Sequence, residues 1–276
     1  MSDAAISGSV VVCRVTNPPL ELITSDKAFR PNPVTVRFAR VIRIEPGTVV
    51  FDIGTGIGPL AIKAAIEGAA RVYAVDPVPL HCELARRNVA KYRLEDRVSV
   101  HQGRFFEPME TDPALQGVKA DVIIADVSGI AEGVSYALGW YSDEVPTGGP
   151  DGTDQIRTLL AAAADFLKPG GTLYFPIALD LSDGDRILAA AEDLFESVEN
   201  AFDKDCFEFP LSPGEVGAIE AAYAHHVPCF VKVQERADRA GVKTSFWRGK
   251  ILVAKGPKRA AECRVVTTNS LRPAPL

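Results

Sequence analysis

The sequence predicts an α/β protein with a doubly wound, seven-stranded and mainly parallel sheet. Three observations support this fold class: a glycine turn joins an apolar strand to a helix at 49–60, a second apolar strand ends in Asp76, and strand and helix patterns alternate from Val49 to Ile177. Such alternation is typical of a parallel sheet with helices on both faces. We expect the last strand, Ser245 to Ala254, to run antiparallel to the others.

The glycine turn predicts a binding site for a nucleoside cofactor. Asp52 lies near the end of the apolar strand, and glycines follow at alternate positions 54, 56 and 58. Glycine lets the backbone approach a ligand where side chains would block it. An acid at the tip of the next strand, here Asp76, is placed to bind ribose hydroxyls. The dinucleotide fingerprint is not met, because Pro59 stands where its third glycine belongs.

Composition limits the other possibilities. The chain has 276 residues and a net charge of −6, which fits one large domain and lowers the expectation of a nucleic-acid partner. Its five cysteines are scattered singly, so we expect no metal site. Because no apolar run is long enough to span a bilayer and no leader pattern begins the chain, we expect a cytoplasmic protein without a membrane partner.

The spacing D-x-G-x-G-x-G around Asp52 resembles motif I of the class I S-adenosylmethionine (SAM) dependent methyltransferases. Further along, GRFFEPM, GGPDG and LKPGG follow in an order similar to that of the release-factor glutamine methyltransferase group, over roughly Phe29 to Ile177. This resemblance implies the Rossmann-like methyltransferase fold and SAM as the cofactor. It also implies that the aromatic-proline-threonine arm before motif I, which ends at Thr35, lies across the cofactor cleft.

The sequence departs from this group at two positions. The group has Asn-Pro-Pro-Tyr after the fourth strand, where this chain has Asp126, Val127, Ser128 and Gly129, and it has an acid where this chain has Arg104. We therefore expect a methyl acceptor different from a glutamine amide, namely a nitrogen or oxygen of a small molecule. A protein methyltransferase acting on glutamine or another side chain is the first alternative, and a non-catalytic SAM-binding module is the second.

Asp126 and Ser128 are the expected catalytic residues. Asp126 follows a central strand at its carboxyl end, where it could accept a hydrogen bond from the acceptor or act as a general base, although it could equally cap the following loop. The alternative for Ser128 is a turn residue. The expected cofactor-binding residues are Thr35, Asp52, Gly54, Thr55, Gly56, Gly58, Asp76, Pro77, Gln102, Gly103, Arg104 and Asp126. The expected substrate-binding residues are Trp140, Tyr141, Tyr223, His225 and His226, for which core packing or a solvated helix end is the alternative.

Three parts are expected along the chain. Residues 1–47 form an N-terminal arm and the helix that leads into the sheet, 48–256 form the SAM-binding domain, and 257–276 form a flexible tail. An insertion at about 205–244 separates the last two strands, with Ser212 and Glu215 as a capping box at the start of a helix. We expect this insertion to be a helical cap over the substrate side, or alternatively a homodimer contact.

Overall fold

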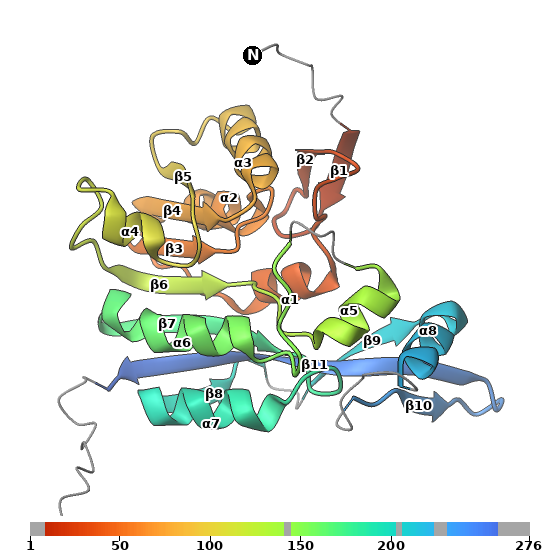
Figure 1. Ribbon diagram of the computed structural model, residues 1–276. Helices are drawn as coiled ribbons and strands as arrows, with labels where there is room; N and C mark the ends of the chain where they lie inside the picture. Colours follow the sequence, from red (N-terminus) through yellow and green to blue (C-terminus); the bar gives the residue numbers. More distant parts are fainter. Residues whose placement is uncertain (1–8, 141–144, 203–205, 224–230, 259–276) are drawn as a thin grey trace, which may run out of the picture.

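The computed structural model describes residues 9–140, 145–202, 206–223 and 231–258, with only the backbone of residue 223, and it shows one central sheet flanked by helices (Figure 1). Nine strands form this sheet, in the order β10-β11-β7-β6-β3-β4-β5, and β8 and β9 also pair with β11. The strands of the parallel part are β3 (Val49–Ile53), β4 (Arg71–Asp76), β5 (Val98–Gln102), β6 (Ala120–Ala125) and β7 (Leu167–Ile177). The predicted α/β class is confirmed.

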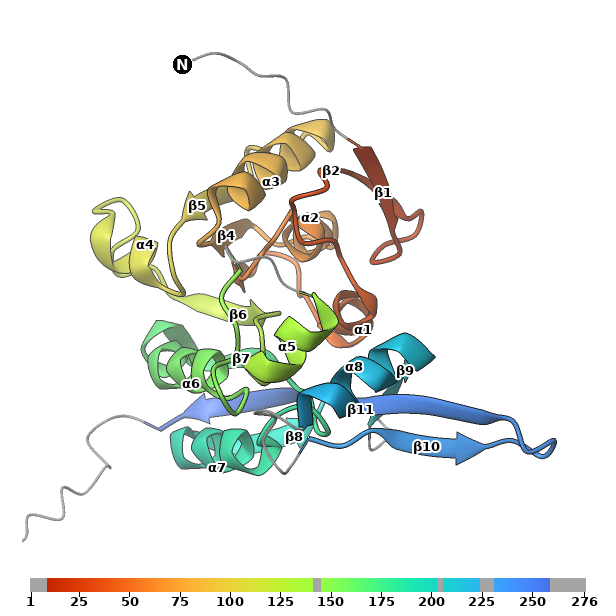
Figure 2. The same ribbon diagram turned by 45° about the vertical axis from the view of Figure 1, so that its right-hand side comes forward.

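Helices cover both faces of the sheet, as continuous apolar strands require. Along β6, Val122 and Ile124 belong to one core cluster, whereas Ile123 and Ala125 belong to the other. The first cluster includes residues of α1 (Pro33–Val41), α2 (Pro59–Ile66) and α3 (Pro79–Lys91), and the second includes residues of α4 (Glu107–Thr111), α6 (Asp154–Phe166) and α7 (Gly184–Leu194). Figures 1 and 2 show these two groups of helices on opposite sides of the sheet.

The N-terminal arm contains more regular structure than the sequence predicted. The sequence predicts only one short strand here, Val10 to Val15, followed by a proline turn and an irregular segment. In the structure, strands β1 (Ser9–Cys13) and β2 (Leu20–Thr24) pair antiparallel as a hairpin. Asn88 of α3 holds β2, because its amide donates to the Ile23 carbonyl at 3.0 Å and accepts from the Ile23 amide at 2.6 Å. The side chain of Asn88 thus makes hydrogen bonds with the β2 backbone of the kind that a neighbouring strand would make. Asn88 is distant from β2 in the sequence.

The insertion between β8 (Phe195–Asn200) and β11 (Lys243–Pro257) is also more strand-rich than predicted. It contains β9 (Phe207–Leu211), α8 (Pro213–Tyr223) and β10 (Gln234–Ala237). The first part of β11 pairs with β9 and β10, while its second part pairs with β7 and β8. In β9, buried residues alternate with exposed ones, a period of two that indicates a strand. The capping box at the start of α8 is confirmed: the Ser212 amide donates to Glu215 Oε2 at 2.8 Å, and the Glu215 amide donates to Ser212 Oγ at 3.3 Å.

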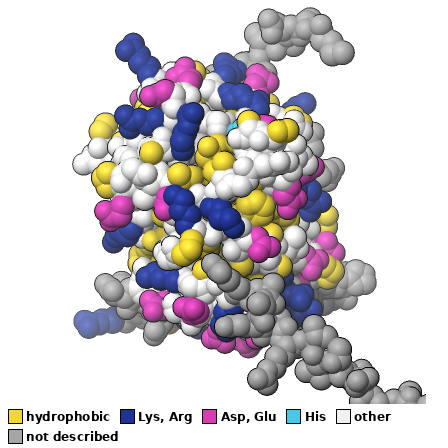
Figure 3. Space-filling view, turned by 90° about the vertical axis from the view of Figure 1, so that its left-hand side faces the viewer, with side chains coloured by type: hydrophobic (Ala, Val, Ile, Leu, Met, Phe, Trp, Pro, Cys, Tyr) yellow, Lys and Arg dark blue, Asp and Glu magenta, His cyan; other side chains and the backbone are white. Residues whose placement is uncertain are grey.

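The surface shows no single-sign charge field on the face drawn in Figure 3, where Lys and Arg side chains stand among acidic and apolar ones. None of the helices in the described part of the chain is long and apolar enough to cross a membrane. Nor do the residues described here include three or more His, Cys, Asp or Glu side chains grouped to hold a metal ion.

Candidate active site

The glycine loop lies between the carboxyl ends of β3 and β4. Gly54 and Gly56 have φ angles of +76° and +53°, a region that favours glycine. A Cβ at Gly54 would lie 3.0 Å from Cγ1 of Val127, so glycine also permits the close packing of the β3 and β6 ends. At Gly56, by contrast, no described atom lies within 4 Å of that position, and the residue lines a cavity. The loop therefore offers bare backbone to a ligand.

Asp52 stabilises this loop through its contact with Thr55. Its side chain is buried, and Thr55 Oγ1 donates a hydrogen bond to its Oδ2 at 2.7 Å. Its other oxygen, Oδ1, is buried and has no partner among the described residues. Burial raises the pKa of Asp52 from 3.8 to about 7. An orphaned buried carboxylate oxygen suits a ligand that brings a positive charge, such as an ammonium group.

Asp76 lies on the other side of the loop, where it accepts three hydrogen bonds. The Gly56 amide donates to its Oδ2 at 2.8 Å, and the Val78 amide donates to its Oδ1 at 2.9 Å. The third partner is Nδ1 of buried His81, 3.0 Å from Oδ1. His81 was not selected by the sequence analysis, because a single histidine in a helix has no distinguishing pattern.

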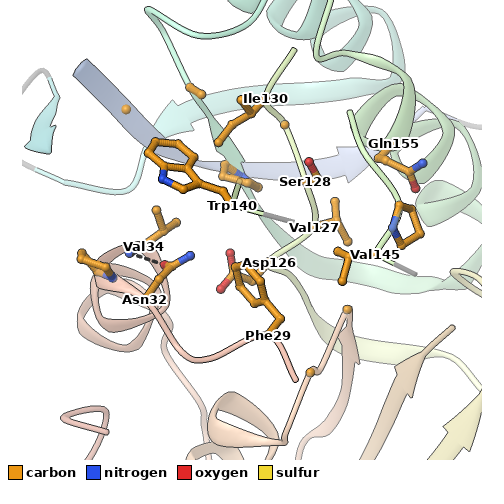
Figure 4. Close-up of a pocket in the computed structure, with 18 of the residues that line it drawn as sticks. Phe29, Asn32, Val34, Asp126, Val127, Ser128, Ile130, Trp140, Val145 and Gln155 are labelled. Carbon is orange, nitrogen blue, oxygen red and sulfur yellow. Dashed lines mark hydrogen bonds between the residues drawn. The ribbon is translucent and has the colours of Figure 1, made fainter. Parts of the chain in front are cut away.

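Asp126 lies at the end of β6, in the cavity. Thr35 Oγ1 of α1 donates to its Oδ2 at 2.8 Å, so the arm that precedes motif I does reach this site. Burial raises the pKa of Asp126 from 3.8 to about 6, although the Thr35 hydrogen bond opposes this change. Nearby, Ser128 Oγ is buried without a partner among the described residues and also lines the cavity. Figure 4 shows Asp126 between Phe29 and Trp140.

One cavity of about 630 Å³ joins the glycine loop to the inserted strands. Of the predicted cofactor residues, Gly54, Gly56, Asp76, Pro77, Arg104 and Asp126 line it. The other six are absent from the described lining: Thr35, Asp52 and Thr55 support it through hydrogen bonds, Gly58 begins α2, and Gln102 and Gly103 end β5 and follow it.

Phe105 lines the cavity beside Arg104, although the sequence analysis did not select it. Its φ angle is +48°, a left-handed conformation that is unusual for a bulky residue. The chain reverses here as Glu107 Oε2 accepts from the Arg104 amide at 3.0 Å. Phe105 therefore lines the cavity, whereas Gln102 is not among its described lining residues.

Three aromatic residues form an aromatic wall in the far part of the cavity: Trp140 after α5, Phe209 of β9 and Trp247 of β11. The rings of Phe209 and Trp247 stack with centroids 4.2 Å apart, and the ring centroid of Trp140 lies 6.3 Å from that of Trp247. Trp140 Nε1 donates to Glu215 Oε1 at 3.3 Å, which connects this wall to α8. Trp140 lines the cavity and its contact with substrate remains a prediction, while Phe209 and Trp247 were not selected from the sequence.

The structure does not describe the side chains of the other predicted substrate-binding residues. Tyr141, His225 and His226 lie outside the described residues, and so does the side chain of Tyr223. Their assignment remains a prediction.

The described residues fit SAM as the cofactor. The open Gly56 backbone and Asp76 line the cavity, and the buried Asp52, with its orphaned oxygen, lies behind the glycine loop. These groups would hold a nucleoside with an amino-acid tail.

Comparisons with known proteins agree with this geometry. Residues 39–134 match the family model described as ribosomal protein L11 methyltransferase (PrmA). The release factor glutamine methyltransferase of Moorella thermoacetica is 35% identical over 199 residues, which are 64% of this chain and 68% of the relative. The ribosomal protein uL3 glutamine methyltransferase of Bordetella pertussis is 37% identical over 148 residues, 52% of this chain and 47% of the relative.

The solved structure of Methanocaldococcus jannaschii Trm5 in complex with adenosine has a similar fold, with a TM-score of 0.53 and 14% sequence identity. The match covers 92% of this chain and 57% of that one.

These names overturn two expectations. The relatives are named for the methylation of proteins, a release factor and ribosomal proteins, and not of small molecules. The predicted small-molecule acceptor, with no nucleic acid among the partners, is therefore wrong. The missing Asn-Pro-Pro-Tyr motif misled the prediction, because the loss of one amide-holding motif does not change the class of the substrate.

The match to the Moorella enzyme extends over more than two thirds of that enzyme at an identity above 30%. Together with the sheet order, the glycine loop and the two carboxylates beside it, this match settles the family. The chain belongs to the release factor glutamine methyltransferase family of class I SAM-dependent methyltransferases.

Proposed function

We propose that this protein transfers a methyl group from SAM to a side-chain nitrogen of a protein of the translation machinery. The relatives' names support a protein substrate of this kind. The observation that carries the chemistry is the position of Asp126, between the glycine loop and the aromatic wall, with one carboxylate oxygen bound to Thr35.

The cofactor half of the cavity would hold SAM by three kinds of contact. Asp76 would accept hydrogen bonds from the ribose hydroxyls, the Asp52 carboxylate would face the ammonium group, and the Gly54–Gly56 backbone would pass close to the amino-acid tail. When bound, SAM supplies a methyl group on a positively charged sulfur. The contribution of the chain is to exclude water and to align an acceptor behind that methyl group.

Asp126 would position the acceptor nitrogen. Its Oδ2 accepts from Thr35, and no described residue donates to Oδ1, which leaves that oxygen available for an acceptor N–H. A carboxylate here can also take up a proton from an amine, since burial has raised the pKa of Asp126 to about 6. The asparagine of the related motif offers one acceptor oxygen and no such proton uptake.

The aromatic wall would receive the substrate chain next to the reacting residue. Trp140 lies on one side of it, after α5 (Glu132–Leu138), and Phe209 and Trp247 of β9 and β11 make the other side. Aromatic side chains at such a site bury large area with little loss of conformational freedom. The insertion therefore acts as a substrate-binding element.

The experiment is a comparison of wild type with Asp126→Asn and Asp126→Ala on release factors and ribosomal proteins uL3 and L11, using SAM with a labelled methyl group. Labelled protein in the wild-type reaction, and about a hundredfold less with Asp126→Ala, would support the proposal. If the acceptor is an amide, Asp126→Asn keeps activity, and if it is an amine, the variant loses activity. Equal labelling by the wild type and both variants would contradict the role of Asp126.

A further inference from the structure

His81 connects the ribose site to the N-terminal arm. It lies on α3 with 3% of its surface exposed, and its Nδ1 is 3.0 Å from Asp76 Oδ1. Its Nε2 lies 3.1 Å from the amide of Phe29, in the arm between β2 and α1. A continuous line of hydrogen bonds therefore runs from the Gly56 amide through Asp76 and His81 to Phe29.

This arrangement fixes the protonation state of the imidazole. A backbone amide can only donate, so Nε2 must accept and carry no proton. Nδ1 then carries the proton and donates to Asp76. Both contacts are satisfied only by this neutral tautomer. A second proton, on Nε2, would place two donors opposite each other and break the contact with Phe29.

The arm that His81 holds is part of the cavity wall. Ala28, Phe29 and Arg30 line the cavity on the side of Asp76 and Pro77. Phe29 and Asp126 both line this cavity, as Figure 4 shows. At its C-terminal end the arm is fixed by Asn32, whose side chain accepts from the Val34 amide at 2.7 Å and caps α1. His81 holds the arm at Phe29, three residues before that cap.

We propose that neutral His81 is a positioning residue that holds the N-terminal arm over the ribose site, and that loss of its Nε2 acceptor releases the arm and weakens cofactor binding. The inference rests on the proposed cofactor site.

Two substitutions separate the two contacts. In His81→Asn the amide nitrogen replaces Nδ1 and keeps the contact with Asp76, while the acceptor for Phe29 is lost. In His81→Gln the amide oxygen reaches the position of Nε2 and keeps an acceptor for Phe29 that does not titrate. The matched control is His101→Asn, because His101 of β5 bonds Ser99 at 2.8 Å and is not among the described residues of the cavity.

The measurement is the dissociation constant of S-adenosylhomocysteine by calorimetry. We expect His81→Asn to bind about fivefold more weakly than wild type, with His81→Gln in between because it keeps an acceptor for Phe29. His101→Asn should follow wild type.

Equal weakening by His81→Asn and His81→Gln would overturn the proposal, since a merely structural histidine gives that result. Equal affinity of His81→Asn and wild type would overturn it too. Failure of the proposed function has a separate signature, namely no heat from the wild-type protein.

Discussion

Two buried carboxylates at the site have pKa values raised by the same cause and serve different purposes. Asp52 and Asp126 both lose water on folding, which raises their pKa values to about 7 and about 6. Asp52 lies behind the glycine loop and Asp126 lies in the cavity. The first is therefore suited to fix the cofactor, and the second to handle the acceptor.

The pH dependence of methyl transfer follows from Asp126. Below about pH 6 its carboxyl group is protonated and can no longer accept from the substrate N–H. We expect the rate of the wild type under saturating SAM to rise with pH through about 6 and then level off. Single-turnover rates at a series of pH values measure this, and a rate that is flat from about pH 5 to about pH 8 would exclude the carboxylate from the step.

The stability of the protein without cofactor should fall as pH rises, because of Asp52. Its pKa is higher in the folded state than in the unfolded one, so between about pH 4 and about pH 7 the folded state binds more protons and each rise in pH favours unfolding. We expect the unfolding free energy of Asp52→Asn to decline over this pH range by up to a few kcal/mol less than that of wild type, since one pKa unit corresponds to about 1.4 kcal/mol.

Urea unfolding of wild type and Asp52→Asn at about pH 5 and about pH 8 tests this expectation. The exposed Asp96→Asn is the matched control and should keep the wild-type decline. A decline equal in wild type and Asp52→Asn would show that Asp52 is not the source.

At the scale of elements, the inserted strands are joined to the core sheet by Asp180, which follows β7. This buried carboxylate accepts from Arg248 Nε at 2.9 Å, from the Arg248 amide at 2.7 Å and from Gln234 Nε2 at 2.9 Å. These hydrogen bonds hold the pKa of Asp180 below its usual value. One residue thereby fixes β10 and β11 in place beside the cavity.

Loss of this carboxylate should loosen the insertion. We expect Asp180→Ala to cost about 3 kcal/mol of unfolding free energy, because several donors lose their partner in a buried place. Thermal unfolding measures this, with the exposed Asp185→Asn as the control. Because the pKa is lowered in the folded state, the contribution should be present at neutral pH and disappear as pH falls below the usual carboxyl range. An unchanged melting temperature at neutral pH would contradict it.

The aromatic wall should affect the substrate and not the cofactor. Trp140→Ala removes one side of the wall, so we expect the KM for the protein substrate to rise about tenfold and that for SAM to stay unchanged. Trp140→Phe keeps a ring but loses the donor to Glu215, so its KM for the protein substrate should lie between those of wild type and Trp140→Ala. Steady-state kinetics with each substrate varied in turn provide the test. A rise in the KM for SAM would place Trp140 in the cofactor half.

At the scale of the whole molecule, local sequence patterns correctly predicted the features that depend on residues close together in the chain. The strand-glycine-helix unit at Asp52 and the capping box at Ser212 each bring together groups a few residues apart. The strand β9 was missed because its partner β11 is distant in the chain. The strand β2 was missed although its partner β1 is close in the chain. The contact between His81 and Phe29, 52 residues apart, has no local signal either.

The family resemblance predicted the cofactor half of the cavity better than the substrate half. Asp76, Gly56 and Asp126 lie as the motifs implied, because the carboxyl ends of parallel strands share one edge. Phe209 belongs to the insertion and Trp247 to the part of β11 that pairs with it, so the aromatic wall exists only after that pairing. The expectation of a small molecule arose from the missing Asn-Pro-Pro-Tyr motif.

The most direct test of the account is transfer of a labelled methyl group from SAM to protein. Purified enzyme would be incubated with release factors and with ribosomal proteins uL3 and L11, and the label in the acid-precipitated fraction would be counted with Asp126→Ala as the reference. The account predicts label in at least one of these proteins, on a side-chain nitrogen, that falls about hundredfold with the variant. Label confined to acid-soluble molecules, or equal with both enzymes, would contradict it.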